Sequence, residues 1–95
     1  MANVSVRIPT PLRPQVDGAA SLELAGATVV EVLHELTRRH QKLHGRLFNE
    51  QGELNRFVNV FLNEEDIRFQ KGLDTPVKYG DGLVLVPAIA GGASA

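Results

Sequence analysis

Two adjacent glycines near the end of the chain, Gly91 and Gly92, point most directly to chemistry. They follow an apolar segment, residues 83–88, whose composition is typical of a β-strand. A backbone without β-carbons can enter a channel that is too narrow for other residues, and it can adopt the turn that the channel imposes. The pattern therefore predicts a thin tail, running through Ala90 and Gly91 to Gly92, that can enter a narrow channel in another protein.

Three further residues, Ala93, Ser94 and Ala95, follow the glycines. They place the terminal carboxylate about 10 Å further along an extended chain. They also bring β-carbons into the part of the tail that would have to enter a channel. The extension conflicts with the use that the two glycines suggest.

Other polar clusters have simpler explanations. His40 and His44 are four residues apart and could share a helix face as metal ligands, but no third ligand accompanies them, and His34 has no catalytic companion. The acidic run 64–66 lacks the spacing of an EF-hand loop and is expected to be a solvated turn, unless it docks on a basic partner. The basic run 38–40 is expected to be a helix surface, with contact to an acidic partner as the alternative.

The sequence contains no serine–histidine–acid set, no paired carboxylates and no Gly-rich phosphate loop. The chain has no cysteine, which excludes disulfides, thiolate metal sites and a cysteine nucleophile. We therefore expect a protein that other enzymes act upon, with no catalytic residues, no metal and no bound cofactor of its own.

Composition limits the class of protein. The 95 residues fit one domain, and the 43% of hydrophobic residues is enough for a core. The net charge is −1, which argues against nucleic acid as the main partner. No segment resembles a secretion signal or approaches the roughly 20 apolar residues that span a bilayer, so we expect a cytoplasmic monomer without membrane contact.

Two alternating segments and a helix form the first half. Residues 3–8 and 21–25 alternate between apolar and polar side chains, which predicts a β-hairpin, and prolines make residues 9–19 an irregular loop. Thr28 and Glu31 form a capping box at the start of an amphipathic helix over residues 28–42, with Gly45 as its stop. The apolar side of this helix is expected to bear Val29, Leu33, Leu36, Leu43 and Leu47.

The second half contains shorter elements. Residues 48–56 are expected to be a loop, residues 57–62 a strand, residues 63–66 a turn and residues 67–69 a short edge strand. In the strand, one face carries Val58, Val60 and Leu62, and the other carries Phe57 and Phe61. One face packs on the helix, and the other lies on the open sheet, where an apolar patch marks a protein contact. The pattern leaves open which face is which.

Residues 83–86 are apolar on both faces, so this strand is expected in the centre of the sheet, parallel to the first strand. The order of elements predicts an α+β fold of the β-grasp, ubiquitin-like type, with a mixed sheet of four to five strands packed on one main helix. We expect residues 1–88 to form this domain and residues 89–95 to form a flexible tail.

This order and the tail resemble the MoaD/ThiS family of ubiquitin-like sulfur-carrier proteins, and within it the CysO-type carriers of actinobacterial cysteine synthesis. The resemblance covers nearly the whole chain to Gly92. It is carried by residues 8–10, 12–14, 56–60, 63–69, 80–82 and 85–92.

The resemblance implies that a MoeB/ThiF-like adenylating enzyme uses ATP to activate the carboxylate of Gly92. Sulfur then displaces AMP and leaves a thiocarboxylate. In CysO-type pathways the acceptor is a pyridoxal-phosphate-dependent cysteine synthase, and a JAMM-type metallopeptidase releases the product. Most members of the family end at the second glycine, so we expect this chain to be a precursor that is cut between Gly92 and Ala93.

Two alternatives within the same fold remain open. The chain could be the small subunit of a molybdopterin synthase, although its longer segment 45–56 makes that less favourable. It could also be a ubiquitin-like modifier that is conjugated to lysines. An interaction domain with an inert tail is a further alternative, which deletion of Gly91 and Gly92 would test.

Overall fold

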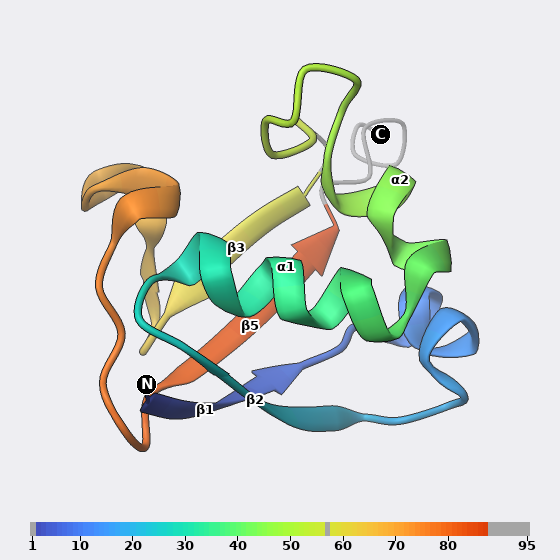
Figure 1. Cartoon of the computed structure of the whole chain (residues 1–95), viewed down its shortest axis with the longest axis horizontal. Helices are drawn as coiled ribbons and strands as arrows, with labels where there is room; N and C mark the ends of the chain where they lie inside the picture. The colour runs from blue at the N-terminus through green and yellow to red at the C-terminus, as the bar shows by residue number, and fades with distance from the viewer. Residues whose placement is uncertain (1, 57, 88–95) are drawn as a thin grey trace.

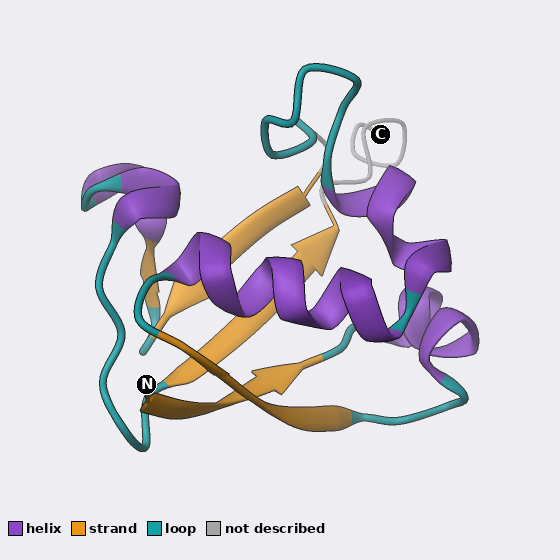
Figure 2. Cartoon of the chain, in the orientation of Figure 1, coloured by secondary structure: helices purple, strands orange, loops and turns teal. Residues whose placement is uncertain are grey.

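The computed structural model describes residues 2–56 and 58–87. Within them, a five-stranded mixed sheet with the strand order β2-β1-β5-β3-β4 lies against helix α1 (Figure 1). The helices lie on one face of the sheet, as Figure 2 shows by colour, and the apolar core fills the space between the two layers. The predicted β-grasp architecture is confirmed.

The hairpin forms as predicted. Strand β1 (Ala2–Arg7) pairs antiparallel with β2 (Ser21–Gly26), with Ala2 opposite Gly26 and Arg7 opposite Ser21. Val4 and Val6 are buried, whereas Ser5 and Arg7 are exposed, because side chains alternate between the two faces of a strand.

The segment between these strands is more regular than predicted. Residues Thr10–Val16 form a 3₁₀ helix, η1, and not an irregular loop. Pro9 precedes the helix and Pro11 lies in its first turn, where a missing N–H breaks no helical hydrogen bond. Pro14 lies inside the helix, where it has no N–H to donate, and the helix nevertheless buries Leu12 and Val16 against the core.

Gly26 marks a close approach between the hairpin and the helix. A β-carbon on this residue would lie 2.8 Å from both Cγ2 and the backbone nitrogen of Val32. Such a contact is far too short, so only glycine allows β2 to pass this closely to α1.

Helix α1 (Val29–Arg39) begins with the predicted capping box. The Thr28 hydroxyl accepts a hydrogen bond from the Glu31 backbone N–H at 3.4 Å, and Glu31 Oε1 accepts one from the Ala27 N–H at 2.9 Å. The first bond satisfies a backbone donor that the first helical turn leaves without an intrahelical partner, and the second joins Glu31 to Ala27, one residue before the N-cap, instead of to Thr28.

Replacing the cap should weaken the fold measurably. We expect Thr28→Ala to lower the free energy of unfolding by about 0.5–2 kcal/mol, measured by urea denaturation. The matched control is Thr10→Ala, a change to an exposed threonine of η1, which should alter stability far less. Equal losses for the two variants would contradict the role given to the cap.

The helix is shorter than predicted. It ends at Arg39 instead of continuing to residue 42, because His40 adopts φ −129° and ψ 80°. The 3₁₀ helix η2 (Gln41–Leu43) and the short helix α2 (His44–Leu47) follow, so Gly45 lies inside a helix and is not its stop. The change of direction brings Leu43 and Leu47 into the core, where they are fully buried with Val29, Leu33 and Leu36, as the periodicity predicts.

Strand β3 (Val58–Leu62) lies between β5 and the two-residue strand β4 (Glu65–Asp66). The predicted edge strand at 67–69 is wrong, since these residues form the 3₁₀ helix η3 (Ile67–Phe69). Asp66 caps this helix by accepting a hydrogen bond from the Arg68 N–H at 2.8 Å, and the turn buries Ile67. A further 3₁₀ helix, η4 (Gly72–Asp74), precedes the last strand.

Strand β5 (Gly82–Pro87) occupies the centre of the sheet as predicted. It runs parallel to β1 and antiparallel to β3. Leu83 and Leu85 point into the core and are fully buried, whereas Val84 and Val86 lie on the opposite face of the sheet. The first half of the strand has neighbours on both edges, and β3 alone pairs with its final residues up to Pro87.

Candidate functional site

The predicted tail follows the last residue of β5 at one end of the sheet. Pro87, the last described residue, pairs with Val58 of β3. The predicted tail 89–95, with Ala90, Gly91, Gly92 and the expected cleavage point before Ala93, lies outside the described residues, as does the boundary at residue 88. These assignments stay predictions.

The segment 48–56, which links α2 to β3, lies beside the end of β5, from which the predicted tail would start (Figure 1). It is held by its own hydrogen bonds: Asn49 Oδ1 accepts from the backbone N–H groups of Gln51 and Glu53, at 2.9 and 3.0 Å. An isolated bridge between Phe48 and Leu54 closes it. The expected loop at residues 48–56 is therefore a hydrogen-bonded turn, and a partner that takes the tail would meet it.

The open face of the sheet carries a small apolar patch. Val58, Val60 and Leu62 are buried in the core, which settles the orientation of β3 and places Phe61 on the open face. Phe61 is half-buried and lies opposite Val84 of β5. Val86 on the same strand is 37% exposed. Phe57 lies outside the described residues, so the predicted contact patch of Phe57 and Phe61 is placed only through Phe61.

The histidines do not form a metal site. His40 ends α1 and His44 begins α2, so the two residues do not share one helix face. His34 and His44 instead pack against the ring of Phe48, with ring centroids 5.2 and 5.4 Å apart. Within residues 2–56 and 58–87, no group of three or more histidine, aspartate or glutamate side chains could hold a metal ion.

In the acidic run 64–66, one of the three negative charges is paired with a nearby arginine. Arg68 Nη2 lies 2.8 Å from Asp66 Oδ2, and the hydrogen bonds from Arg68 lower the pKa of Asp66 below its ordinary value. Glu64 is exposed and adopts φ 76°, and Glu65 is exposed as well. Asp66 forms an ion pair with Arg68, so Glu64 and Glu65 carry the two solvated carboxylates of the acidic run 64–66.

The basic end of α1 contains an ion-pair cluster. Glu35 accepts hydrogen bonds from Arg38 Nε at 3.0 Å and Nη2 at 2.6 Å, and from Arg39 Nε at 2.8 Å. These bonds, from Arg38 first and Arg39 second, lower the pKa of Glu35 from 4.5 to about 2. One carboxylate therefore serves two guanidinium groups, which leaves a net positive charge in the cluster.

The depressed pKa of Glu35 predicts a pH-dependent contribution to stability. The contribution is present above the ordinary pKa of 4.5 and is lost as the pH falls towards about 2. Compared with the native chain, Glu35→Gln should lower the melting temperature slightly near neutral pH, since exposed pairs contribute little. The difference should shrink as the pH falls from 4.5 to 2, as followed by thermal unfolding.

The control for this experiment is Glu23→Gln, which makes the same change of charge on β2, away from the two arginines. A difference between native chain and Glu35→Gln that stays constant down to pH 2 would contradict the assignment.

A groove next to this cluster was not predicted. It has a volume of about 410 Å³ and lies between η1 and the end of α1. The side chains around it come from these two segments and from η2: Pro14, Gln15, Asp17, Arg38, Arg39, His40, Gln41 and Lys42. The sequence contains a signal for it, because residues 38–46 include four arginines and lysines and no acid. What the sequence does not reveal is that η1 forms the second wall.

None of the helices in the described part of the chain combines the length and the apolar character that crossing a membrane requires.

The chain is similar to known proteins both in sequence and in structure. The ThiS family matches residues 6–92. The sulfur carrier protein CysO of Mycobacterium tuberculosis is 41% identical over 92 residues, which span 95% of this chain and 99% of the relative. The match to the family ends on Gly92, the second of the two adjacent glycines.

Solved structures agree with the sequence comparison. The Amycolatopsis orientalis BexX/CysO complex contains a chain with a TM-score of 0.85 and 46% identity, covering 92% of this chain and 97% of that one. The small archaeal modifier protein 1 of Methanosarcina acetivorans gives a TM-score of 0.84 at 31% identity, covering 95% and 96%. With a ubiquitin-like fold, a family match over nearly its full length and a CysO carrier as a relative, this chain belongs to the ThiS family.

Proposed function

We propose that this chain is a protein sulfur carrier whose reacting group is the carboxylate of Gly92. The carboxylate attacks the α-phosphate of ATP in an adenylating enzyme of the MoeB/ThiF type and releases pyrophosphate. A sulfur nucleophile then displaces AMP and leaves a thiocarboxylate on Gly92. The observation that carries the proposal is the similarity to a CysO sulfur carrier over nearly the whole chain, with a family match that ends on Gly92.

The geometry of β5 supports this role. The strand is paired with β1 up to Val84 and with β3 up to Pro87, so docking of the sheet fixes where the tail starts. Residues 88–92 then span at most about 17 Å when extended. The carrier thus supplies the binding surface and the tail supplies the reacting atom, and docking makes the reaction effectively intramolecular. ATP is bound by the partner enzyme, and the carrier needs no cofactor or catalytic residue of its own.

Processing precedes activation in this proposal. A JAMM-type metallopeptidase cuts between Gly92 and Ala93 and removes Ala93, Ser94 and Ala95. The active site for adenylation must admit the carboxylate and exclude water, since water would hydrolyse the acyl adenylate. A tail that continues beyond Gly92 carries its carboxylate about 10 Å past the reacting position, which is the main physical reason for the cut.

For the sulfur acceptor, we propose a pyridoxal-phosphate-dependent cysteine synthase or another enzyme of sulfur metabolism. The thiocarboxylate sulfur would attack an electrophilic carbon on the acceptor's substrate, and the same peptidase would release the product. Enzymes of this kind work in the cytoplasm, which is the compartment that we propose for the carrier.

A second candidate is a ubiquitin-like modifier whose activated Gly92 forms amide bonds with lysines. The observation that favours it is the 31% identity to the small archaeal modifier protein 1 of Methanosarcina acetivorans at a TM-score of 0.84. The activation step is the same in both cases, because sulfide and a lysine amine attack the same carbonyl carbon.

The mass of the protein recovered from its native cell separates these functions. A carrier that ends at Gly92, with one oxygen replaced by sulfur, supports the proposal. Adducts of higher mass with a Gly-Gly remnant on lysines favour the modifier. Sulfur carried by a chain that still ends at Ala95 would contradict the processing step.

A further inference from the structure

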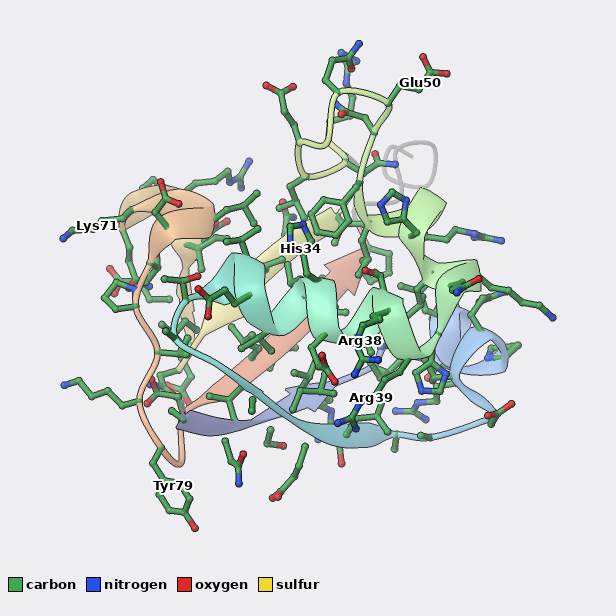
Figure 3. All side chains as sticks on the ribbon, in the orientation of Figure 1. His34, Arg38, Arg39, Glu50, Lys71 and Tyr79 are labelled. Carbon is green, nitrogen blue, oxygen red and sulfur yellow. The ribbon has the colours of Figure 1, made fainter. Side chains whose placement is uncertain are left out.

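The groove at the end of α1 is part of a wider basic surface. Residues 38–46 carry Arg38, Arg39, Lys42 and Arg46 and contain no acid, in a chain whose net charge is −1. All four side chains are exposed. Figure 3 shows Arg38 and Arg39 side by side on α1, far from Lys71 and Tyr79. We use the name basic surface for residues 38–46 together with the facing residues of η1, Pro14 and Gln15.

The charge on this surface is not cancelled by its own acids. Glu35 serves both Arg38 and Arg39, and Asp17 on the far wall is the other carboxylate near the groove. Lys42 and Arg46 add two positive charges beyond this cluster. Since exposed cations this close together repel one another, a ligand with negative charges would stabilise the arrangement.

Gln15 shows that the groove has a polar wall with unused hydrogen-bonding capacity. Its Oε1 atom is buried and has no hydrogen-bond partner among the described residues. Buried polar atoms in proteins nearly always have a partner. Gln15 thus adds a buried, unpaired polar atom to the residues that line the groove.

The residue that directly follows the basic surface is joined to the base of the tail by a series of hydrogen bonds. Leu47, the last residue of α2, accepts a hydrogen bond from the Asn55 N–H at 2.7 Å. The Asn55 carbonyl accepts one from Val58 at 3.0 Å, and Val58 pairs with Pro87. A protein that takes the tail can therefore touch the basic surface in the same complex.

We propose that the basic surface is the docking site for an acidic surface beside the tail-accepting channel of a partner enzyme; this inference rests on the proposed function. The exposed fork of a guanidinium matches a carboxylate, as the pairing of Arg38 with Glu35 already demonstrates in this structure.

Nucleic acid fits the same surface less well. Proteins that bind single strands combine positive charge with aromatic side chains on which bases stack. The large aromatic residues that are most exposed in the described part of the chain, Phe69 and Tyr79, belong to the segment between β4 and β5 and not to the basic surface. The negative net charge of the chain also opposes long-range attraction of a polyanion.

The first test uses the adenylating enzyme of the MoeB/ThiF type from the same genome and the carrier ending at Gly92. We expect the double variant Lys42→Glu with Arg46→Glu to raise KM for the carrier about tenfold and to leave kcat unchanged. The kcat/KM of the native carrier should fall as salt is added, and that of the variant should fall less. The matched control, Lys71→Glu with Lys78→Glu, makes the same change of charge on exposed lysines elsewhere and should behave like the native carrier.

Equal KM values for the double variant and the control would overturn the inference. So would a drop in kcat with unchanged KM, because that would place these residues in the chemical step instead of in docking.

A second measurement does not depend on adenylation, so it separates failure of this inference from failure of the proposed function. The isotope-labelled carrier is titrated with a short peptide of alternating glutamate and glycine, and separately with a single-stranded oligonucleotide of equal charge. Shifts of amide signals confined to residues 13–17 and 38–46 with the peptide, and lost in the double variant, would support the inference. Tighter binding of the oligonucleotide, or no selective shift with the peptide, would overturn it.

Discussion

A carrier that ends at Gly92 is expected to be adenylated at least about a hundredfold faster than the chain that ends at Ala95. The three extra residues move the carboxylate about 10 Å beyond its proper position if the channel accepts the tail in extended form. Displacing a reacting group by far less than this already costs about two orders of magnitude in rate. The measurement is ATP–pyrophosphate exchange with a MoeB/ThiF-type enzyme, followed by the mass of the carrier after addition of sulfide.

A third chain separates the effect of length from the effect of side chains. In this control the full-length tail carries glycine at all three extra positions, Ala93→Gly, Ser94→Gly and Ala95→Gly. We expect it to be as slow as the native full-length chain, because its carboxylate is still misplaced. Equal rates for the chains that end at Gly92 and Ala95 would remove the need for processing.

The largest expected loss of stability follows from a change in the last strand. Leu85→Ala should lower the free energy of unfolding by about 2–5 kcal/mol, because Leu85 is 1% exposed and its removal leaves a cavity that the core fills only in part. A domain of this size has a total stability of about 5–15 kcal/mol, so the variant should lose a large fraction of its stability. Urea denaturation followed by circular dichroism gives the difference.

The adjacent residue provides the control. Val86 is on the same strand but faces the open side of the sheet, where it is 37% exposed. Val86→Ala should cost about 1 kcal/mol or less. If the two variants lost the same amount of stability, the assignment of the buried face of β5 would be wrong.

Most of the fold could be predicted because its main signals are local. The hairpin follows from the alternation in β1 and β2, and the start of α1 follows from the capping box at Thr28. The central position of β5 follows from its apolar residues on both faces, since only an inner strand is covered in that way. In each case the residues that carry the signal are those that make the contact.

The errors arose where tertiary contacts decide the local structure. A periodic pattern through residue 42 predicts a longer α1, but the chain turns at His40 and so brings Leu43 and Leu47 into the core. Ile67 has the composition of a strand, yet burial of its side chain and the cap from Asp66 produce a 3₁₀ turn. Propensity cannot reveal such choices, because they depend on where the sheet lies.

The site was predictable in part. The assignment of Gly91 and Gly92 stays a prediction, which rests on their lack of side chains and on their place after a strand. Which face of β3 is open could not be derived from alternation, which is symmetrical, and required the buried positions of Val58, Val60 and Leu62. The basic surface requires η1 and α1 to face each other, and these segments are far apart in sequence.

The central position of β5 has a consequence for the order of events during synthesis. Translation completes this strand after every other strand of the sheet, yet β5 is the one that joins β1 to β3. Until it inserts, both of these strands have an unpaired edge, and the core lacks Leu83 and Leu85. The strand that precedes the proposed reactive end is therefore also the one that completes the fold, so a partner enzyme that binds the finished sheet would act only on a folded chain.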